Sequence, residues 1–237
     1  MNAGPDKTAI RDAATVIVLR DRLGDPQVLM GQRGHAAAFM PNMVVFPGGA
    51  VDPDDADVRL ATPLPDLCAR RLCEDCATDL SHALATAAIR ELWEETGLVL
   101  GRRGNWDGPL PEDWRSFAAT GHVPRADPLQ FIFRAITPPG RTRRFDARFF
   151  LVDAVEIAGD IDDFSAASDE LSHLQWVPLR DIRAFDLPFI TQVVLAEVAA
   201  RAHDTAPPLS VPYFRNDDEE SLFLRLSGTD PRQEPTA

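Results

Sequence analysis

The sequence has no long hydrophobic run. None of the apolar stretches in its 237 residues approaches the roughly 18 residues that a membrane-spanning helix needs. Residues 1–12 are polar and contain no apolar core of the kind found in secretory signals. We therefore expect a cytoplasmic protein without a membrane partner.

Cysteine is scarce, and the three cysteines lie close together as Cys68, Cys73 and Cys76. An odd number argues against a disulfide framework. With His82 they supply the ligands of a closed tetrahedral zinc site, which would make the chain a zinc-stabilised interaction module. Their spacing is not that of standard paired knuckles, so we expect thiols packed in a helical segment and no zinc.

Basic residues are outnumbered, with 24 lysines and arginines against 37 acids, which gives a formal net charge of −13. Such a chain repels a polymer of phosphates, so a nucleic-acid partner is disfavoured. A small phosphorylated metabolite can still bind where metal ions or a few arginines stand at the site. A second copy of the chain, forming a homodimer, is retained as a candidate partner.

Strand and helix patterns are interleaved without regular alternation, which predicts an α/β protein with a mixed sheet between helical layers. Strands are expected at 13–20, 27–33, 43–46, 129–137, 145–152, 171–177, 209–214 and 221–226. Helices are expected at 81–96, capped by Ser81 and stopped by Gly97, and at 112–120, 178–185 and 188–203. The length suits one domain over 1–226, followed by a disordered tail at 227–237.

Residues 52–80 are rich in proline and acidic side chains. This composition favours a surface excursion outside the central sheet, with one short helix around the cysteines.

Three glutamates share one face of the helix expected at 81–96. At about 100° per residue, Glu91, Glu94 and Glu95 fall within about 100° of one another, beside an apolar stripe that is suited to packing on a sheet. A solvated acidic face is one interpretation. Because only Arg90 is near enough to offset their mutual repulsion, a site for a hard divalent cation is the other.

Upstream, Phe46-Pro47-Gly48-Gly49 predicts a tight loop directly after a strand. Glycines at such a place let backbone amides approach phosphate oxygens, although a Gly-Gly pair alone is more often just a turn.

These two segments together resemble the Nudix signature, in which a Gly is followed after five residues by a Glu and after seven more by Arg-Glu-hydrophobic-x-Glu-Glu-x-Gly-hydrophobic. Gly49 matches the first position, and Arg90-Glu91-Leu92-Trp93-Glu94-Glu95-Thr96-Gly97-Leu98 matches the second half throughout. The departures lie between them. Counting forward from Gly49 reaches Asp55, counting back from Arg90 reaches His82, and 34 residues separate Asp55 from Arg90, an insertion of 27.

Within that superfamily the chain resembles the acyl-coenzyme A diphosphatase branch, where a long segment also splits the signature. The likeness lies in Gln32-Arg33, Phe39-Met40-Pro41, residues 45–49, 143–150 and 170–178. It implies cleavage of the diphosphate of coenzyme A or its thioesters to 3′,5′-ADP and 4′-phosphopantetheine. Diphosphatase activity on ADP-ribose or dinucleotides is the alternative, and a non-catalytic nucleotide-binding sensor is another.

The resemblance also implies roles for single residues. Glu91, Glu94 and Glu95 would hold Mg²⁺ or Mn²⁺, which neutralises a diphosphate and activates water, and Arg90 would orient one of these carboxylates. The catalytic base would be Glu91 or Glu170, although Glu170 could be an ordinary carboxylate at a strand end. The candidate substrate contacts are Arg33, Gly48, Gly49, Arg143, Arg144 and Arg148. Phe39, Trp106 and Trp114 could stack on adenine or line an acyl pocket, or they could simply belong to the core.

Overall fold

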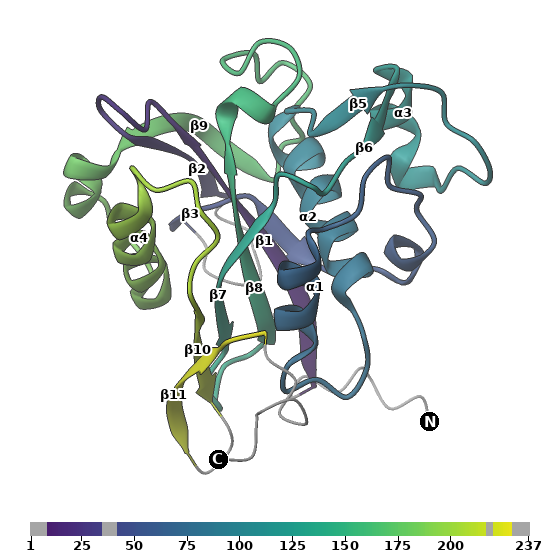
Figure 1. Ribbon diagram of the computed structural model, residues 1–237. Helices are drawn as coiled ribbons and strands as arrows, with labels where there is room; N and C mark the ends of the chain where they lie inside the picture. The colour runs from purple at the N-terminus through teal and green to yellow at the C-terminus, as the bar shows by residue number, and fades with distance from the viewer. Residues whose placement is uncertain (1–8, 35–41, 217–219, 229–237) are drawn as a thin grey trace, which may run out of the picture.

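The computed structural model describes residues 9–34, 42–216 and 220–228, which form a mixed sheet between two helical layers (Figure 1). The strand order is β11-β10-β7-β8-β1-β2-β3, with β4 added beside β1 and β9 beside β2. The pairs β1–β8 and β7–β10 are parallel, and the other pairs are antiparallel. The predicted α/β class is therefore confirmed.

The strands follow the sequence pattern closely. They are β1 (Ile10–Arg20), β2 (Gln27–Arg33), β3 (Val44–Val45), β4 (Gly48–Ala50), β7 (Gln130–Ile136), β8 (Arg144–Asp153), β9 (Leu171–Pro178), β10 (Val211–Asn216) and β11 (Ser221–Leu226). The sequence did not indicate β4, because two glycines are poor strand formers. It forms here because Ala13, Ala14 and Thr15 of β1 offer it a backbone partner.

Helices cover both faces of the sheet. Helices α1 (Asp66–Cys73) and α2 (Ser81–Thr96) lie on one face, and α4 (Phe189–Arg201) lies on the other (Figure 1). Each side has its own core. Ile89 and Leu92 of α2 pack with Val16 of β1 on the first side, while Val194 and Val198 of α4 pack with the opposite face.

Several predicted helices have a different form in the structure. The segment 112–120 is a 3-10 turn, η2 (Glu112–Trp114), followed by the short helix α3 (Arg115–Ala119), and 178–185 is the 3-10 helix η4 (Leu179–Ala184). Ser81 is not the cap of α2. It is the first helical residue, and its hydroxyl donates to Asp79 Oδ1 at 2.7 Å. A further 3-10 turn, η3 (Ala154–Glu156), follows β8.

A small lobe lies beside the C-terminal end of α2. It contains α3 and a two-stranded sheet of β5 (Gly101–Arg103) and β6 (His122–Pro124), which sequence patterns did not indicate (Figure 1). Residues 52–80 supply only η1 (Pro53–Ala56) and α1 as regular elements and no strand of the central sheet, as predicted.

The C-terminal part of the described chain is held against α1. Ser227 and Gly228 donate backbone hydrogen bonds to the Glu74 carboxylate, and Arg70 and Arg71 donate to their carbonyls. The rest of the tail expected at 227–237 lies outside the described residues. In the ranges described, no helix is long and apolar enough to cross a membrane.

Candidate active site

Helix α2 presents the three glutamates because its other side is fully buried. Ala85, Ile89 and Leu92 have no exposed surface, so the predicted apolar stripe faces the sheet. Gly97 ends the helix in the left-handed conformation, with φ of 74°, and its amide donates to Trp93 O at 2.7 Å. These constraints fix which way Glu91, Glu94 and Glu95 point.

Glu95 is held by the strand β4. The backbone amide of Gly48 donates to Glu95 Oε2 at 2.7 Å, while Glu95 Oε1 is buried and has no hydrogen-bond partner in the described structure. Burial raises the pKa of Glu95 to about 8. The Gly48 amide therefore contacts a glutamate in this structure, and its contact with a substrate phosphate stays a prediction.

Gly49 allows Glu91 to approach β4. A Cβ atom at this position would lie within 2.6 Å of the Glu91 carboxylate, so any larger residue would force that carboxylate to move. Burial raises the pKa of Glu91 to about 7, although Arg90 opposes the shift. Gly49 thus determines the close packing of the strand on the acidic face of α2.

Arg90 connects this acidic face to the segment after Gly49. Its Nε and Nη2 donate to the two oxygens of Asp55 at 3.0 and 2.9 Å, and its Nη1 donates to Glu91 Oε1 at 2.8 Å and reaches Glu94 Oε2 at 3.4 Å. Burial lowers the pKa of Arg90, but these carboxylates outweigh burial and raise it overall. Asp55 is 1% exposed.

The sequence alone indicates no role for Asp55, because the signature has a glutamate at that position. Its spacing from Gly49 matches the glutamate position of the signature and could have indicated a role. In the structure, Asp55 makes a bidentate ion pair with Arg90. The long segment between Asp55 and Arg90 does not prevent this contact.

Glu170 and Arg33 lie near the same cluster. Glu170 adds negative potential at all three glutamates, and Arg33 favours the charged form of Glu95. The neighbouring Ser168 amide donates to Glu94 O at 2.7 Å, and Arg33 pairs with Leu171 on β9. The structure therefore brings both predicted residues to the C-terminal end of α2. Arg33 Nε is buried without a partner among the described residues.

The chemistry of this cluster suits a divalent cation. Buried carboxylates are costly unless they are paired with positive charge, and Glu95 Oε1 has no partner of any kind in the described residues. Hard cations such as Mg²⁺ select oxygen ligands of this type. No group of three carboxylate, imidazole or thiolate side chains in the described ranges is arranged to hold a metal ion, and Arg90 forms ion pairs with Glu91 and Glu94. The Glu94 side chain is 34% exposed and has room to turn away from Arg90.

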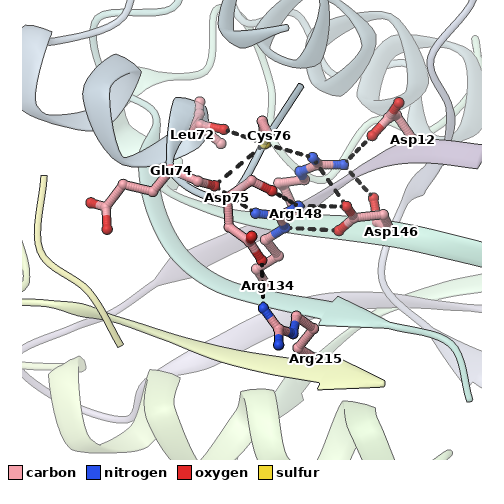
Figure 2. A network of polar contacts seen from close by, with 9 residues as sticks. All are labelled: Asp12, Leu72, Glu74, Asp75, Cys76, Arg134, Asp146, Arg148 and Arg215. Atoms are coloured by element: carbon pink, nitrogen blue, oxygen red, sulfur yellow. Dashed lines mark hydrogen bonds and ion pairs between the residues drawn. The ribbon is translucent and has the colours of Figure 1, made fainter. Parts of the chain in front are cut away.

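Two of the predicted substrate contacts are instead internal. Arg148 is 1% exposed and contacts Asp12, Asp146 and the Cys76 thiol, in a network that also includes Arg134 (Figure 2). Arg144 is buried and donates to Thr137 O and Asn216 O, both at 3.0 Å. Both predictions are corrected, because these guanidinium groups are occupied by protein partners.

Arg143 is exposed at the start of β8, far from the glutamates. Arg144 pairs with Ile10 and Gly48 pairs with Thr15, five residues further along β1, which places them about 16 Å apart along the strand direction. Of the four arginines predicted to contact the substrate, only Arg33 lies at the cluster.

The cysteines and His82 are also separately engaged. Cys68 is buried in the core, Cys76 contacts Leu72 O, and His82 Nε2 contacts Val58 O at 2.8 Å. Burial raises the pKa of Cys68 and of Cys73 to about 11 in each case.

Four aromatic rings contact one another in a row that begins at Trp93, the residue before Glu94. Trp93 contacts Phe117 edge-on at 5.9 Å, Phe117 contacts Trp114 at 5.2 Å, and Trp114 contacts Trp106 at 5.7 Å between ring centroids. Trp114 is 1% exposed and belongs to the core, whereas Trp106 is half-buried. Phe39 lies outside the described residues.

Comparisons with known proteins agree with this geometry. A crystal structure of a NUDIX hydrolase from Alicyclobacillus acidocaldarius is 30% identical, covers 83% of this chain and 94% of its own, and superposes with a TM-score of 0.63. A curated Caenorhabditis elegans protein, nudix hydrolase 7, is 29% identical over 189 residues, or 75% of this chain. The chain spans about half the length (54%) of that relative. No family model matches the chain.

Both relatives are Nudix hydrolases, and the likeness to the Alicyclobacillus protein, at 30% identity, extends over nearly all of that structure. The chain belongs to the Nudix hydrolase family.

Proposed function

We propose that this protein hydrolyses a diphosphate bond in a small nucleotide-containing metabolite, with Mg²⁺ or Mn²⁺ held by Glu91, Glu94 and Glu95. The observation that supports this best is that all three glutamates lie on one side of α2 and are held there, Glu91 and Glu94 by Arg90 and Glu95 by the Gly48 amide. A bound divalent cation would neutralise the diphosphate and lower the pKa of a water molecule.

The residues of the chain supply the remaining functions. Arg90, fixed by Asp55, holds Glu91 in place, and Arg33 provides a cation beside Glu95 for a substrate phosphate. Water attacks one phosphorus atom, its proton passes to a carboxylate, and the bond to the bridging oxygen breaks to release the second phosphate. Glu170 suits proton acceptance better than Glu91. It is exposed and has no ion pair in the described structure, whereas Glu91 is buried against Arg90.

We propose coenzyme A or an acyl-coenzyme A as the substrate, giving 3′,5′-ADP and (acyl-)4′-phosphopantetheine. The sequence likeness over residues 32–33, 45–49 and 170–178 supports this choice. Arg144 and Arg148 do not, because both are engaged within the protein.

A substrate panel tests the proposal. The purified protein is incubated with coenzyme A, an acyl-coenzyme A, ADP-ribose and NADH, each with Mg²⁺ and with a chelator. We expect Mg²⁺-dependent release of 3′,5′-ADP, with the highest kcat/KM for a coenzyme A derivative. Faster cleavage of ADP-ribose would show that coenzyme A is not the preferred substrate, while diphosphate hydrolysis would remain the reaction. Tight nucleotide binding without any turnover would instead indicate a sensor domain.

A further inference from the structure

A basic cavity lies in the small lobe, beside β5 and the loop that follows it. A cavity of about 210 Å³ is lined by Arg59, Arg102, Arg103, Trp106 and Asp107, together with backbone of the loop that follows β5. Acids outnumber basic residues in the whole chain, but three arginines surround this cavity with one carboxylate. The local charge is therefore opposite in sign to that of the protein.

The arginines are available to a ligand. Arg102 and Arg103 are exposed, and neither forms an ion pair in the part of the chain that the structure describes. Arg59 Nη1 contacts Asp107 Oδ2 at 3.0 Å, but both side chains are about two-thirds exposed or more, at 66% and 72%. An exposed pair of this kind adds little stability, so an incoming dianion can replace the carboxylate.

Trp106 gives the cavity a rigid aromatic side. Its ring packs against Trp114, and its Nε1 donates to Pro109 O at 3.2 Å, which leaves it little freedom to turn. Aromatic rings stack on nucleobases of any sequence, and planar guanidinium groups grip phosphate oxygens in pairs.

The size of the cavity limits what it holds. Pockets that enclose a whole drug-sized ligand usually exceed about 300 Å³, so this cavity suits a phosphate and part of one ring. We propose that it binds a nucleotide through a phosphomonoester, with Arg102 and Arg103 on the phosphate and Trp106 against the base. This proposal does not depend on which diphosphate the enzyme cleaves.

Two sources of that phosphomonoester are compatible with the geometry. The ring contacts from Trp106 through Trp114 and Phe117 lead to Trp93, the neighbour of Glu94. One source is a bound substrate, whose phosphomonoester lies away from the bond that is cleaved. The other is a separate nucleotide, whose binding depends on the concentration of product or substrate.

Calorimetric titration with adenosine 3′,5′-bisphosphate, in a chelator that prevents turnover, tests the binding. The full chain should bind the bisphosphate at least about tenfold more tightly than it binds adenosine, because the phosphate contacts are charge-assisted. The double variant Arg102→Ala/Arg103→Ala should lose about 10- to 100-fold in affinity. Arg115→Ala is the matched control, since Arg115 is exposed in the same lobe but does not line the cavity. A double variant that binds as tightly as the wild type, or an equal loss in the control, would overturn the proposal. Circular dichroism melting of each variant separates loss of the site from loss of the fold.

Steady-state kinetics distinguish the two sources. If the pocket holds the remote phosphate of the substrate, the double variant raises KM for coenzyme A but not for 3′-dephospho-coenzyme A. If it holds a separate nucleotide, KM for both substrates is unchanged and the effect of added bisphosphate on the rate is lost. The calorimetric titration measures binding without turnover, so its result holds even if neither coenzyme A compound is a substrate. A cavity that does not bind the bisphosphate and an enzyme that does not cleave coenzyme A therefore give different results.

Discussion

Arg90 and Asp55, 35 residues apart in the sequence, form a buried bidentate ion pair that joins helix α2 to the segment after Gly49. The same guanidinium contacts Glu91 and Glu94 and donates to Ala50 O at 3.0 Å. One side chain therefore positions the two glutamates and β4 together.

Removing the charge of Asp55 should weaken this connection. We expect Asp55→Asn to lower the free energy of unfolding by about 2 kcal/mol, because Arg90 keeps its burial and loses a charged acceptor. Asp54→Asn is the control, since Asp54 is exposed next to it. Urea denaturation measures the free energy of unfolding of both variants. Equal values would show that the buried ion pair does not contribute to stability.

Adding one methyl group at Gly49 should disturb Glu91. A Cβ would overlap the carboxylate, which must then move, and a displacement of about 1 Å in a catalytic group can reduce turnover about 100-fold. We expect this loss for Gly49→Ala in an otherwise folded protein. Gly34→Ala should have no effect, because no atom of the described residues beyond its chain neighbours lies within 4 Å of a Cβ there. Comparable kcat values for the two variants would show that the close approach is not required.

Much of the fold could be read from local patterns. The apolar stripe of α2, the stop at Gly97 and the β1–β2 hairpin depend on residues that are close in sequence, and all appear in the structure. The β5–β6 pair could not be predicted. Its strands have three residues each, and the segment that contains η2 and α3 separates them in the sequence.

The placement of Glu91, Glu94 and Glu95 on one helix could be predicted, because their spacing within α2 determines which face they share. The roles of isolated arginines could not be predicted, because an arginine in a strand has the same local pattern whether it meets a ligand or a carboxylate. The role of Arg148 depends on its contacts with Asp12 and Asp146, and the contact with Asp12 spans 136 residues. The pairing of Asp55 with Arg90 escapes prediction for the same reason, since the two residues lie 35 positions apart in the sequence.

The network around Arg148 should matter for stability and not for specificity. We expect Arg148→Ala to destabilise the fold by about 3 kcal/mol, because Asp146 loses one of its two buried arginine partners (Figure 2). Arg143→Ala should change stability by less than about 0.5 kcal/mol and leave kcat/KM unaltered, because Arg143 is exposed and far from α2. Denaturation and kinetics on both variants check this. Loss of activity without loss of stability in Arg143→Ala would show that Arg143 contacts the substrate.

Two of the thiols should react slowly at neutral pH. A pKa of about 11 for Cys68, caused by burial, and for Cys73, caused by burial and by Asp79, leaves roughly one thiolate in a thousand at pH 8. Their alkylation rates should rise about tenfold per pH unit from pH 8 to 10 while the fold persists, as followed by peptide mass spectrometry. Rapid modification of either thiol at pH 7 would contradict these values, and one tightly held equivalent of zinc would contradict the expected thiol packing.

The central claim is that the glutamates of α2 support metal-dependent diphosphate hydrolysis, and Glu94→Gln tests it most directly. Glu94 is the most accessible of the three, and Arg90 keeps Asp55 and Glu91 when Glu94 is neutralised, so the fold should be unharmed. We expect the Mg²⁺-dependent kcat to fall by about 10²- to 10³-fold, as for loss of one preorganised electrostatic group, with an unchanged melting temperature. Glu112→Gln, an exposed carboxylate in the small lobe, should retain full activity. Near-normal Mg²⁺-dependent turnover in Glu94→Gln would contradict the account.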